Sequence, residues 1–309
     1  MANRIDVHHY CLPEAYTKAY RDAHTNLSTW FLPKWALEAD NTFSVSQQIS
    51  TTIFSLTSPG TSIVHGAAGN ALAREVNEQG ASLVRSNPKK FGFFAIVPDL
   101  CDGLDPVLEE VRCAFDELNA DGVILLTRYG KDYHYLGHLD FLPLWDELEK
   151  RKVVVFIHPT QLVSPKLVKP YLEQPFLDYP HETARTAMAL ITQNVIRDHP
   201  NVKIILSHAG NTLPYVITRA AVTMPDAGFS NEKSTEEMME EARGFYFDLA
   251  LSGNEYQLPL IRKFAKPGRI LFGTDFLYAP DKSIEVYTRY LDGCEMGVEE
   301  REGIDRAMR

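Results

Sequence analysis

The chain has 309 residues, of which 45% are hydrophobic and 23% are charged, and its formal net charge is −10. This composition is typical of a globular protein with a large core, and the acidic excess disfavours nucleic acid and anionic membranes as partners. No apolar run approaches the roughly 18 residues that a membrane span requires, and no signal-like segment precedes the first expected strand. We therefore expect a cytoplasmic protein whose residues 1–309 form one domain.

Short apolar runs predict eight β-strands, and several of these runs are apolar at every position. In chain order they cover about residues 4–7, 50–56, 91–97, 122–126, 153–158, 202–207, 244–249 and 269–273. Helical periodicity predicts helices over about residues 69–85, 104–117, 141–151 and 182–198, and the charged stretch 299–309 has helical character. Residues 13–43 show no clean period, and we interpret them as a long loop.

Strands that are apolar at every position are expected in parallel sheets, because both faces of such sheets are buried. About eight of them, separated by helices, predict a (β/α)₈ TIM-like barrel. A doubly wound open sheet is the alternative. We prefer the barrel because no glycine-rich phosphate-binding turn follows any of the early strands.

The four cysteines carry little functional information. Cys11, Cys101, Cys113 and Cys294 show no paired spacing of the kind that binds metal. We expect them to be free thiols in a reducing compartment.

Polar side chains gather at the ends of the expected strands, where the active sites of such barrels lie. His8 ends the first strand, Arg128 follows the fourth, His158 ends the fifth, His208 follows the sixth, and Asp275 follows the eighth. A single histidine in such a place usually only caps its strand. Imidazoles and a carboxylate together bind a borderline divalent ion such as Zn²⁺ and leave positions open for substrate, so the set indicates a metal site.

The same motifs resemble the amidohydrolase superfamily over nearly the whole chain. Within it they are similar to the decarboxylase branch of the aminocarboxymuconate-semialdehyde and γ-resorcylate decarboxylases, and most of all to the 6-methylsalicylate decarboxylases. The residues that carry the resemblance are Asp6-Val7-His8-His9-Tyr10, His158-Pro159-Thr160, His208-Ala209-Gly210 and Gly273-Thr274-Asp275.

This resemblance implies an amidohydrolase-type barrel with one divalent ion, with Zn²⁺ favoured and Mn²⁺ as the alternative. It implies non-oxidative decarboxylation of an ortho-hydroxy aromatic acid such as 6-methylsalicylate. His8, His158 and Asp275 match metal ligands, and His208 matches a histidine that contacts substrate or an activated water. Arg219 matches an arginine that in some relatives reaches the neighbouring subunit's site, which implies a homodimer or a larger homo-oligomer.

The chain departs from the family pattern at three positions. Tyr10 stands where the second histidine of a His-x-His motif is usual, Arg128 stands where some members have asparagine, and Asn211 replaces a small or acidic residue. Because strand side chains alternate between faces, Tyr10 should face the metal pocket with His8, while His9 points away and is structural. A phenol, with a reference pKa of about 10, is a poor ligand for a weakly acidic ion.

We expect Asp275 to deliver a proton to the ring carbon that bears the carboxylate, and His208 to hold a ring oxygen or the carboxylate. Arg128 could bind the substrate carboxylate bidentately or could be a surface arginine. Trp30, Trp35 and Tyr278 are candidates for the ring pocket, although the tryptophans could equally be an aromatic plug in their loop. Two alternatives remain: a metal-dependent hydrolase of a lactone or amide, and a metal-free non-catalytic relative.

Overall fold

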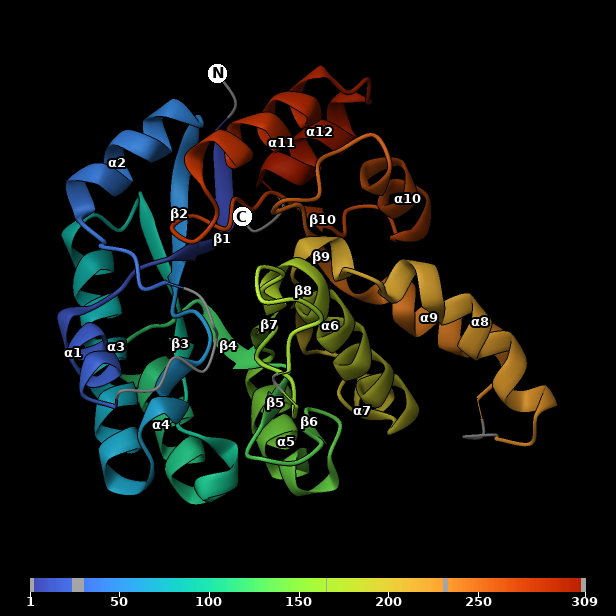
Figure 1. Ribbon diagram of the computed structural model, residues 1–309, viewed down its shortest axis with the longest axis horizontal. Coiled ribbons are helices and arrows are strands. Elements are labelled where there is room, and N and C mark those ends of the chain that lie inside the picture. Colours follow the sequence, from blue (N-terminus) through green and yellow to red (C-terminus); the bar gives the residue numbers. More distant parts are fainter. Residues whose placement is uncertain (1–2, 24–30, 165, 230–232, 307–309) are drawn as a thin grey trace.

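The computed structural model describes residues 3–23, 31–164, 166–229 and 233–306. Within them, eight parallel strands form one sheet that curves into a barrel, with helices around the outside (Figure 1). The (β/α)₈ prediction is confirmed. In sheet order the strands are β1 (Arg4–Tyr10), β2 (Ile49–Ser55), β3 (Phe91–Ile96), β4 (Gly122–Leu126), β7 (Val154–His158), β8 (Lys203–Leu206), β9 (Tyr246–Asp248) and β10 (Ile270–Leu271).

The first and last strands meet through the residues that follow β10. The Val7 amide donates to the carbonyl of Phe272 at 3.2 Å, and the Tyr10 amide donates to the carbonyl of Phe276 at 2.7 Å. The Asp275 amide also donates to the His8 carbonyl at 2.9 Å. These bonds place the loop after β10 directly beside the carboxyl end of β1.

Most helices follow the strands in alternation, as a barrel requires. A two-stranded hairpin, β5 (Arg128–Tyr129) and β6 (His134–Tyr135), follows β4. The α-helices are α1 (Glu14–Asp22), α2 (Leu37–Ser46), α3 (Gly66–Ser86), α4 (Leu104–Asp116), α5 (Leu142–Arg151), α6 (Gln174–Thr192), α7 (Val195–Asp198), α8 (Leu213–Asp226), α9 (Thr235–Gly244), α10 (Gln257–Phe264), α11 (Asp281–Gly293) and α12 (Val298–Arg306), and the short 3₁₀ turns are η1 (Gly60–Ile63), η2 (Leu100–Asp102), η3 (Leu139–Phe141) and η4 (His208–Gly210).

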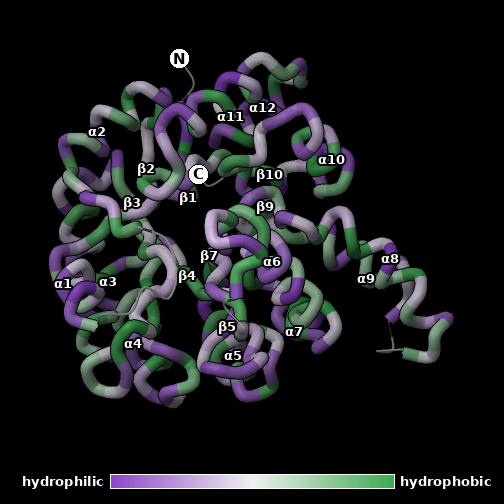
Figure 2. Tube along the Cα trace, viewed as in Figure 1, coloured by the Kyte–Doolittle hydropathy of each residue, from purple (hydrophilic) through white to green (hydrophobic). Residues whose placement is uncertain are grey.

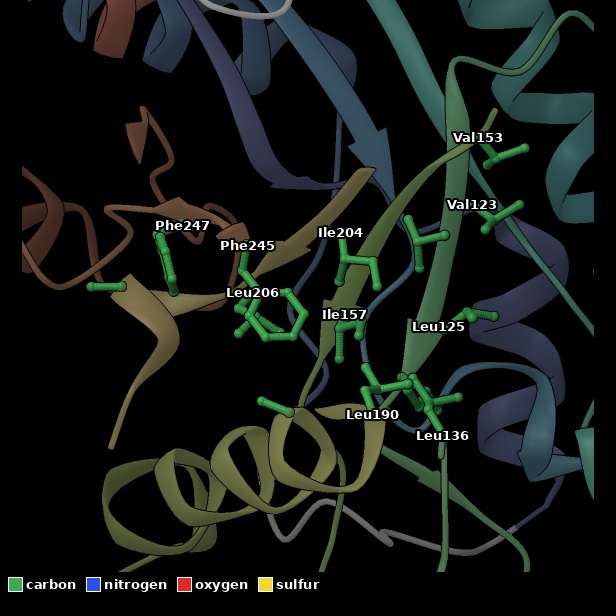
Figure 3. Packing of buried hydrophobic residues seen from close by; sticks show 14 of the residues in the cluster. Val123, Leu125, Leu136, Val153, Ile157, Leu190, Ile204, Leu206, Phe245 and Phe247 are labelled. Carbon is green, nitrogen blue, oxygen red and sulfur yellow. The ribbon is translucent and has the colours of Figure 1, made fainter. Parts of the chain in front are cut away.

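The strands are buried on both faces, which explains their continuous apolar runs. In β4, Ile124 belongs to one hydrophobic cluster, while its neighbours Val123 and Leu125 belong to another. Figure 3 shows side chains of this second cluster between β4, β7 and β8 and the helix α6, which contributes Leu190. Along the outer helices, hydrophilic and hydrophobic residues alternate, as expected of helices with one face on the barrel and one in water (Figure 2).

Two expectations about helices were wrong. Residues 13–43 contain α1 and much of α2 rather than one long loop. Both helices are short. The helix α1 is amphipathic and buries Tyr16, whereas α2 has almost no periodic apolar face and buries Phe43. The helix expected over 182–198 begins earlier, as α6, and breaks at Asn194, whose φ of 62° is left-handed.

No helix in the described part of the chain is both long enough and apolar enough to cross a bilayer. All four cysteines are free, as predicted.

Candidate metal centre and substrate pocket

Four side chains from distant parts of the chain converge at the carboxyl end of the barrel. His8 lies in β1, His158 ends β7, His208 follows β8, and Asp275 follows β10. One ligand atom from each lies within 4.8 Å of the others. The structure therefore brings the sequence-predicted ligand residues together with His208.

His8 is completely buried and is held at both ring nitrogens. Its Nδ1 lies 3.0 Å from Asp248 Oδ2, and its Nε2 lies 3.2 Å from Asp275 Oδ1. Burial lowers the pKa of His8, but the Asp248 and Asp275 carboxylates outweigh burial and raise the pKa to about 10. Metal-binding histidines usually have this arrangement: one ring nitrogen faces a carboxylate and the other faces the metal ligands.

The other two histidines present unoccupied nitrogen atoms. His158 Nδ1 is buried and has no hydrogen-bond partner. Burial, reinforced by His8 and His208, lowers the pKa of His158 well below its usual value, so the ring is neutral. His208 Nδ1 lies 2.9 Å from the carbonyl oxygen of Ala250, which fixes the proton on Nδ1 and leaves the Nε2 lone pair free.

These donors fit a divalent metal ion. A buried imidazole nitrogen without a partner costs free energy unless something satisfies it, and a metal ion at His158 would do so. Three imidazoles and one carboxylate are a donor set suited to Zn²⁺ and, less selectively, to Mn²⁺.

Tyr10 faces the cluster, as strand alternation predicted. Its hydroxyl lies 2.5 Å from His8 Nε2, and its ring is completely buried. Burial and then the charge of Asp275 raise the pKa of Tyr10 well above 10, so the side chain is a neutral phenol. His9 points elsewhere, to Asp6 and Asp40 at 2.9 Å each.

The backbone around the cluster is strained. His208, Ala209 and Asn211 have φ values of 54°, 56° and 53°, and Asp275 has a φ of 64°. Residues other than glycine rarely adopt this left-handed region, and such strain concentrates at functional sites. Two of these strained residues, His208 and Asp275, belong to the cluster.

A cavity of about 280 Å³ opens onto the cluster. Its polar donors include Ser58, Tyr179 and Ser252, and among the described residues no lysine or arginine lines it. Its walls also carry Phe176 and Leu251. The full lining is Tyr10, Thr57, Ser58, His158, Pro175, Phe176, Tyr179, Pro180, His208, Asn211, Leu251, Ser252, Gln257, Asp275, Tyr278, Ala279 and Pro280.

The other predicted pocket residues are placed differently. Tyr278 lines the cavity, 5.6 Å from the Tyr10 ring between centroids, whereas Trp30 lies outside the described residues. Trp35 is not part of the lining: its Nε1 donates to Asp40 Oδ2 at 3.0 Å, which favours the aromatic-plug interpretation. Arg219 is exposed on α8 and does not line the cavity.

Arg128 does not match its predicted role as a carboxylate ligand. Its guanidinium is buried and donates to the carbonyls of Gln161 and Gly130 at 2.8 and 2.9 Å. These bonds hold the β5–β6 hairpin against the loop after β7. Backbone carbonyls thus occupy two of its five N–H donors, and Arg128 is not among the residues that line the cavity.

Sequence reasoning missed Asp248 and Tyr179. Asp248 ends β9, a strand position of the kind that marked the other site residues. Tyr179 lies on α6, and nothing in its sequence context sets it apart. Its hydroxyl is buried and forms no hydrogen bond to a described residue, although burial raises its pKa and the nearby Ser58 side chain has a smaller, lowering effect on that pKa.

The fold and the metal-binding cluster together define a class of protein. A family model described as amidohydrolase matches residues 5–304, so the chain belongs to the amidohydrolase family.

Individual proteins of this family are similar to the chain over most of its length. The chain is 46% identical over 305 residues to the 6-methylsalicylic acid decarboxylase of Penicillium expansum, covering 98% of this chain and 93% of that protein. It is 46% identical to a 6-methylsalicylic acid decarboxylase of Aspergillus aculeatus, covering 94% and 88%. A solved dihydroxybenzoic acid decarboxylase from Polaromonas, with bound manganese and the inhibitor 2-nitroresorcinol, has a similar fold: the TM-score is 0.81 at 20% identity, with 99% of this chain and 95% of that chain covered.

Proposed function

We propose that this protein catalyses the metal-dependent, non-oxidative decarboxylation of an ortho-hydroxy aromatic acid such as 6-methylsalicylate. The observation that carries the proposal is the cluster of three histidines and Asp275, with His8 and His158 buried, at one end of a small, partly apolar cavity. The 6-methylsalicylic acid decarboxylases that align over nearly the whole chain support the substrate class.

His8, His158 and Asp275 would hold the ion, and His208 faces the same point. Zn²⁺ is our first choice because imidazole donors predominate, and a manganese-bound structural neighbour supports Mn²⁺ as the alternative. When bound, the ion supplies Lewis-acid stabilisation for the anionic substrate. This charge matters because no lysine or arginine lines the cavity in the part of the chain that the structure describes.

The cavity supplies the remaining recognition through neutral groups. The Tyr179 hydroxyl has an unused donor, and burial keeps the phenol neutral by raising its pKa. We assign it a hydrogen bond to a substrate oxygen. Phe176, Leu251 and Tyr278 provide apolar surface for the ring and its methyl group.

Asp275 is the proposed proton donor. Its side chain is 12% exposed, toward the cavity, whereas that of His8 beside it is fully buried. The proton goes to the ring carbon that carries the carboxylate, the bond from that carbon to the carboxyl carbon then breaks, and CO₂ leaves. The bonding electrons return to the ring, which regains aromaticity, and Asp275 is reprotonated from water. His208, oriented through Ala250, is placed to hold the ortho oxygen or the carboxylate.

The decisive experiment incubates the purified protein with 6-methylsalicylate and measures CO₂ and 3-methylphenol. Removing divalent ions with a chelator should abolish turnover, and adding Zn²⁺ or Mn²⁺ should restore it. D275N should abolish decarboxylation, while D281N, an exposed aspartate at the start of α11, should not. Turnover of a lactone or amide instead, or near-full activity of D275N, would overturn the assignment.

We also propose that the chain forms at least a homodimer in which Arg219 reaches the neighbouring site. The helix α8, which carries Arg219, extends away from the barrel together with α9 (Figure 1). It exposes large apolar side chains, with Tyr215 82% and Val222 46% exposed, and such surface favours a protein partner. Light scattering should give at least twice the chain mass, and R219A should lose activity while keeping its metal; a monomeric active enzyme would refute this assembly.

A further inference from the structure

A second group of metal-binding side chains lies in the hairpin that follows β4, away from the catalytic cluster. His134 is in β6, and His138 and Asp140 lie in the turn that leads into α5. The amide of His138 donates to the carbonyl of Tyr135 at 2.8 Å, and this tight turn brings the two histidine rings within 4.4 Å of each other. One ligand atom from each of the three residues lies within 4.8 Å of the others.

Among the described residues, the ion pair that these three side chains form is the one between His138 and Asp140. His134 Nδ1 is buried and has no hydrogen-bond partner. His138 Nδ1 lies 3.4 Å from Asp140 Oδ2 and accepts a 3.3 Å bond from the Asp140 amide. Among the described residues, no lysine or arginine forms an ion pair with Asp140. Two imidazoles and a carboxylate thus lie together and still have atoms that could bind a metal ion.

We propose that His134, His138 and Asp140 form a second site for a borderline divalent ion such as Zn²⁺. Imidazole nitrogens select transition ions over Mg²⁺ and Ca²⁺, which prefer oxygen ligands. Three protein ligands leave room for water, and the carboxylate of Asp140 is 73% exposed, so an ion can enter without opening the fold. The site binds more weakly than the catalytic cluster because it offers three ligands instead of four and they are less buried.

An ion at this site would stabilise one wall of the substrate cavity. Tyr135, next to His134, donates its hydroxyl to both carboxylate oxygens of Glu182 at 3.0 Å. Glu182 lies on α6, one turn beyond Tyr179 and Pro180, which line the cavity. Because the ion binds only the folded hairpin, it raises the stability of this region by mass action.

The test counts bound ions in the holoenzyme. Protein that carries one equivalent of Zn²⁺ is titrated with further Zn²⁺ against a coloured competing chelator, and the melting temperature is followed in parallel. Wild type should take up one further, weaker equivalent and melt at a higher temperature. The H134A/H138A variant should take up none and show no added rise, while it keeps its first equivalent and its decarboxylase activity.

Two further variants make the result specific. H65A removes an exposed histidine that pairs with Asp102 alone, and it should keep the second equivalent. D140N, the mildest change at the site, should weaken the second equivalent at least tenfold without altering the fold. A second equivalent retained by H134A/H138A, or missing from wild type, overturns the proposal, and neither result bears on the catalytic assignment.

Discussion

Asp248 offers a sharp test of how the metal centre is built, because it touches the predicted ligands without belonging to them. Asp248 is completely buried. Its Oδ2 lies 3.0 Å from His8 Nδ1, and its Oδ1 accepts from the amides of His208 and Ala250 at 3.2 and 2.9 Å. One carboxylate thus orients two of the clustered histidines.

Replacing Asp248 with asparagine keeps the size of the side chain but removes its charge. The amide can turn its NH₂ group toward His8, which would place the ring proton on Nε2 and remove the lone pair that faces the metal centre. Changing the partner of a metal-bound histidine typically costs about 10- to 100-fold in metal affinity or activity, or roughly 1.4 to 2.7 kcal/mol. We expect D248N to lose at least tenfold in metal affinity.

The assay measures metal affinity by competition with a chelator, and kcat/KM for 6-methylsalicylate at saturating ion. D146N is the matched control, because Asp146 also pairs with a histidine, His199, but at a 66% exposed position far from the cavity lining. It should behave as wild type. If D248N binds its ion as tightly as wild type and turns over at the same rate, the proposed orientation of His8 is wrong.

Three further predictions follow from individual side chains. Y179F should lower kcat/KM about tenfold or more, because it removes one hydrogen bond to an anionic substrate. Y16F, which removes a similarly buried and unpartnered hydroxyl outside the cavity lining, should leave kcat/KM unchanged. Equal effects of the two substitutions would argue against a contact between Tyr179 and substrate. Y10F should keep one equivalent of metal, because the buried phenol stays neutral, and loss of the ion on metal analysis would instead make Tyr10 a ligand. Burial lowers the pKa of His9, but Asp40 and Asp6 raise it to about 9. Protonated His9 therefore adds at most about 3 kcal/mol to the free energy of unfolding. This contribution is fully present below pH 6.5, the usual pKa of histidine, and is lost as the pH rises through 9. Denaturant unfolding of wild type and H9Q across this range should show a steeper slope in wild type, because His8, whose pKa is raised to about 10, contributes equally to both proteins.

Much of the fold could be predicted from local sequence, for a physical reason. Strands buried on both faces must be apolar throughout, so runs such as residues 122–126 identify parallel strands without knowledge of their neighbours. Alternation along β1 also separated Tyr10, which faces the centre, from His9, which bonds to Asp6 and Asp40. The helix α2 escaped prediction because it has almost no periodic apolar face, whereas α1 is periodic but only nine residues long.

The sequence by itself predicted the barrel and the convergence of His8, His158, His208 and Asp275, because parallel strands of a barrel end at the same face. Only the tertiary structure decided what surrounds them. It paired Arg128 with two backbone carbonyls. It also brought Tyr179, on the helix α6, to the cavity. Side chains from loops and helices come into contact only when the barrel closes. Their spacing along the chain therefore does not predict these contacts.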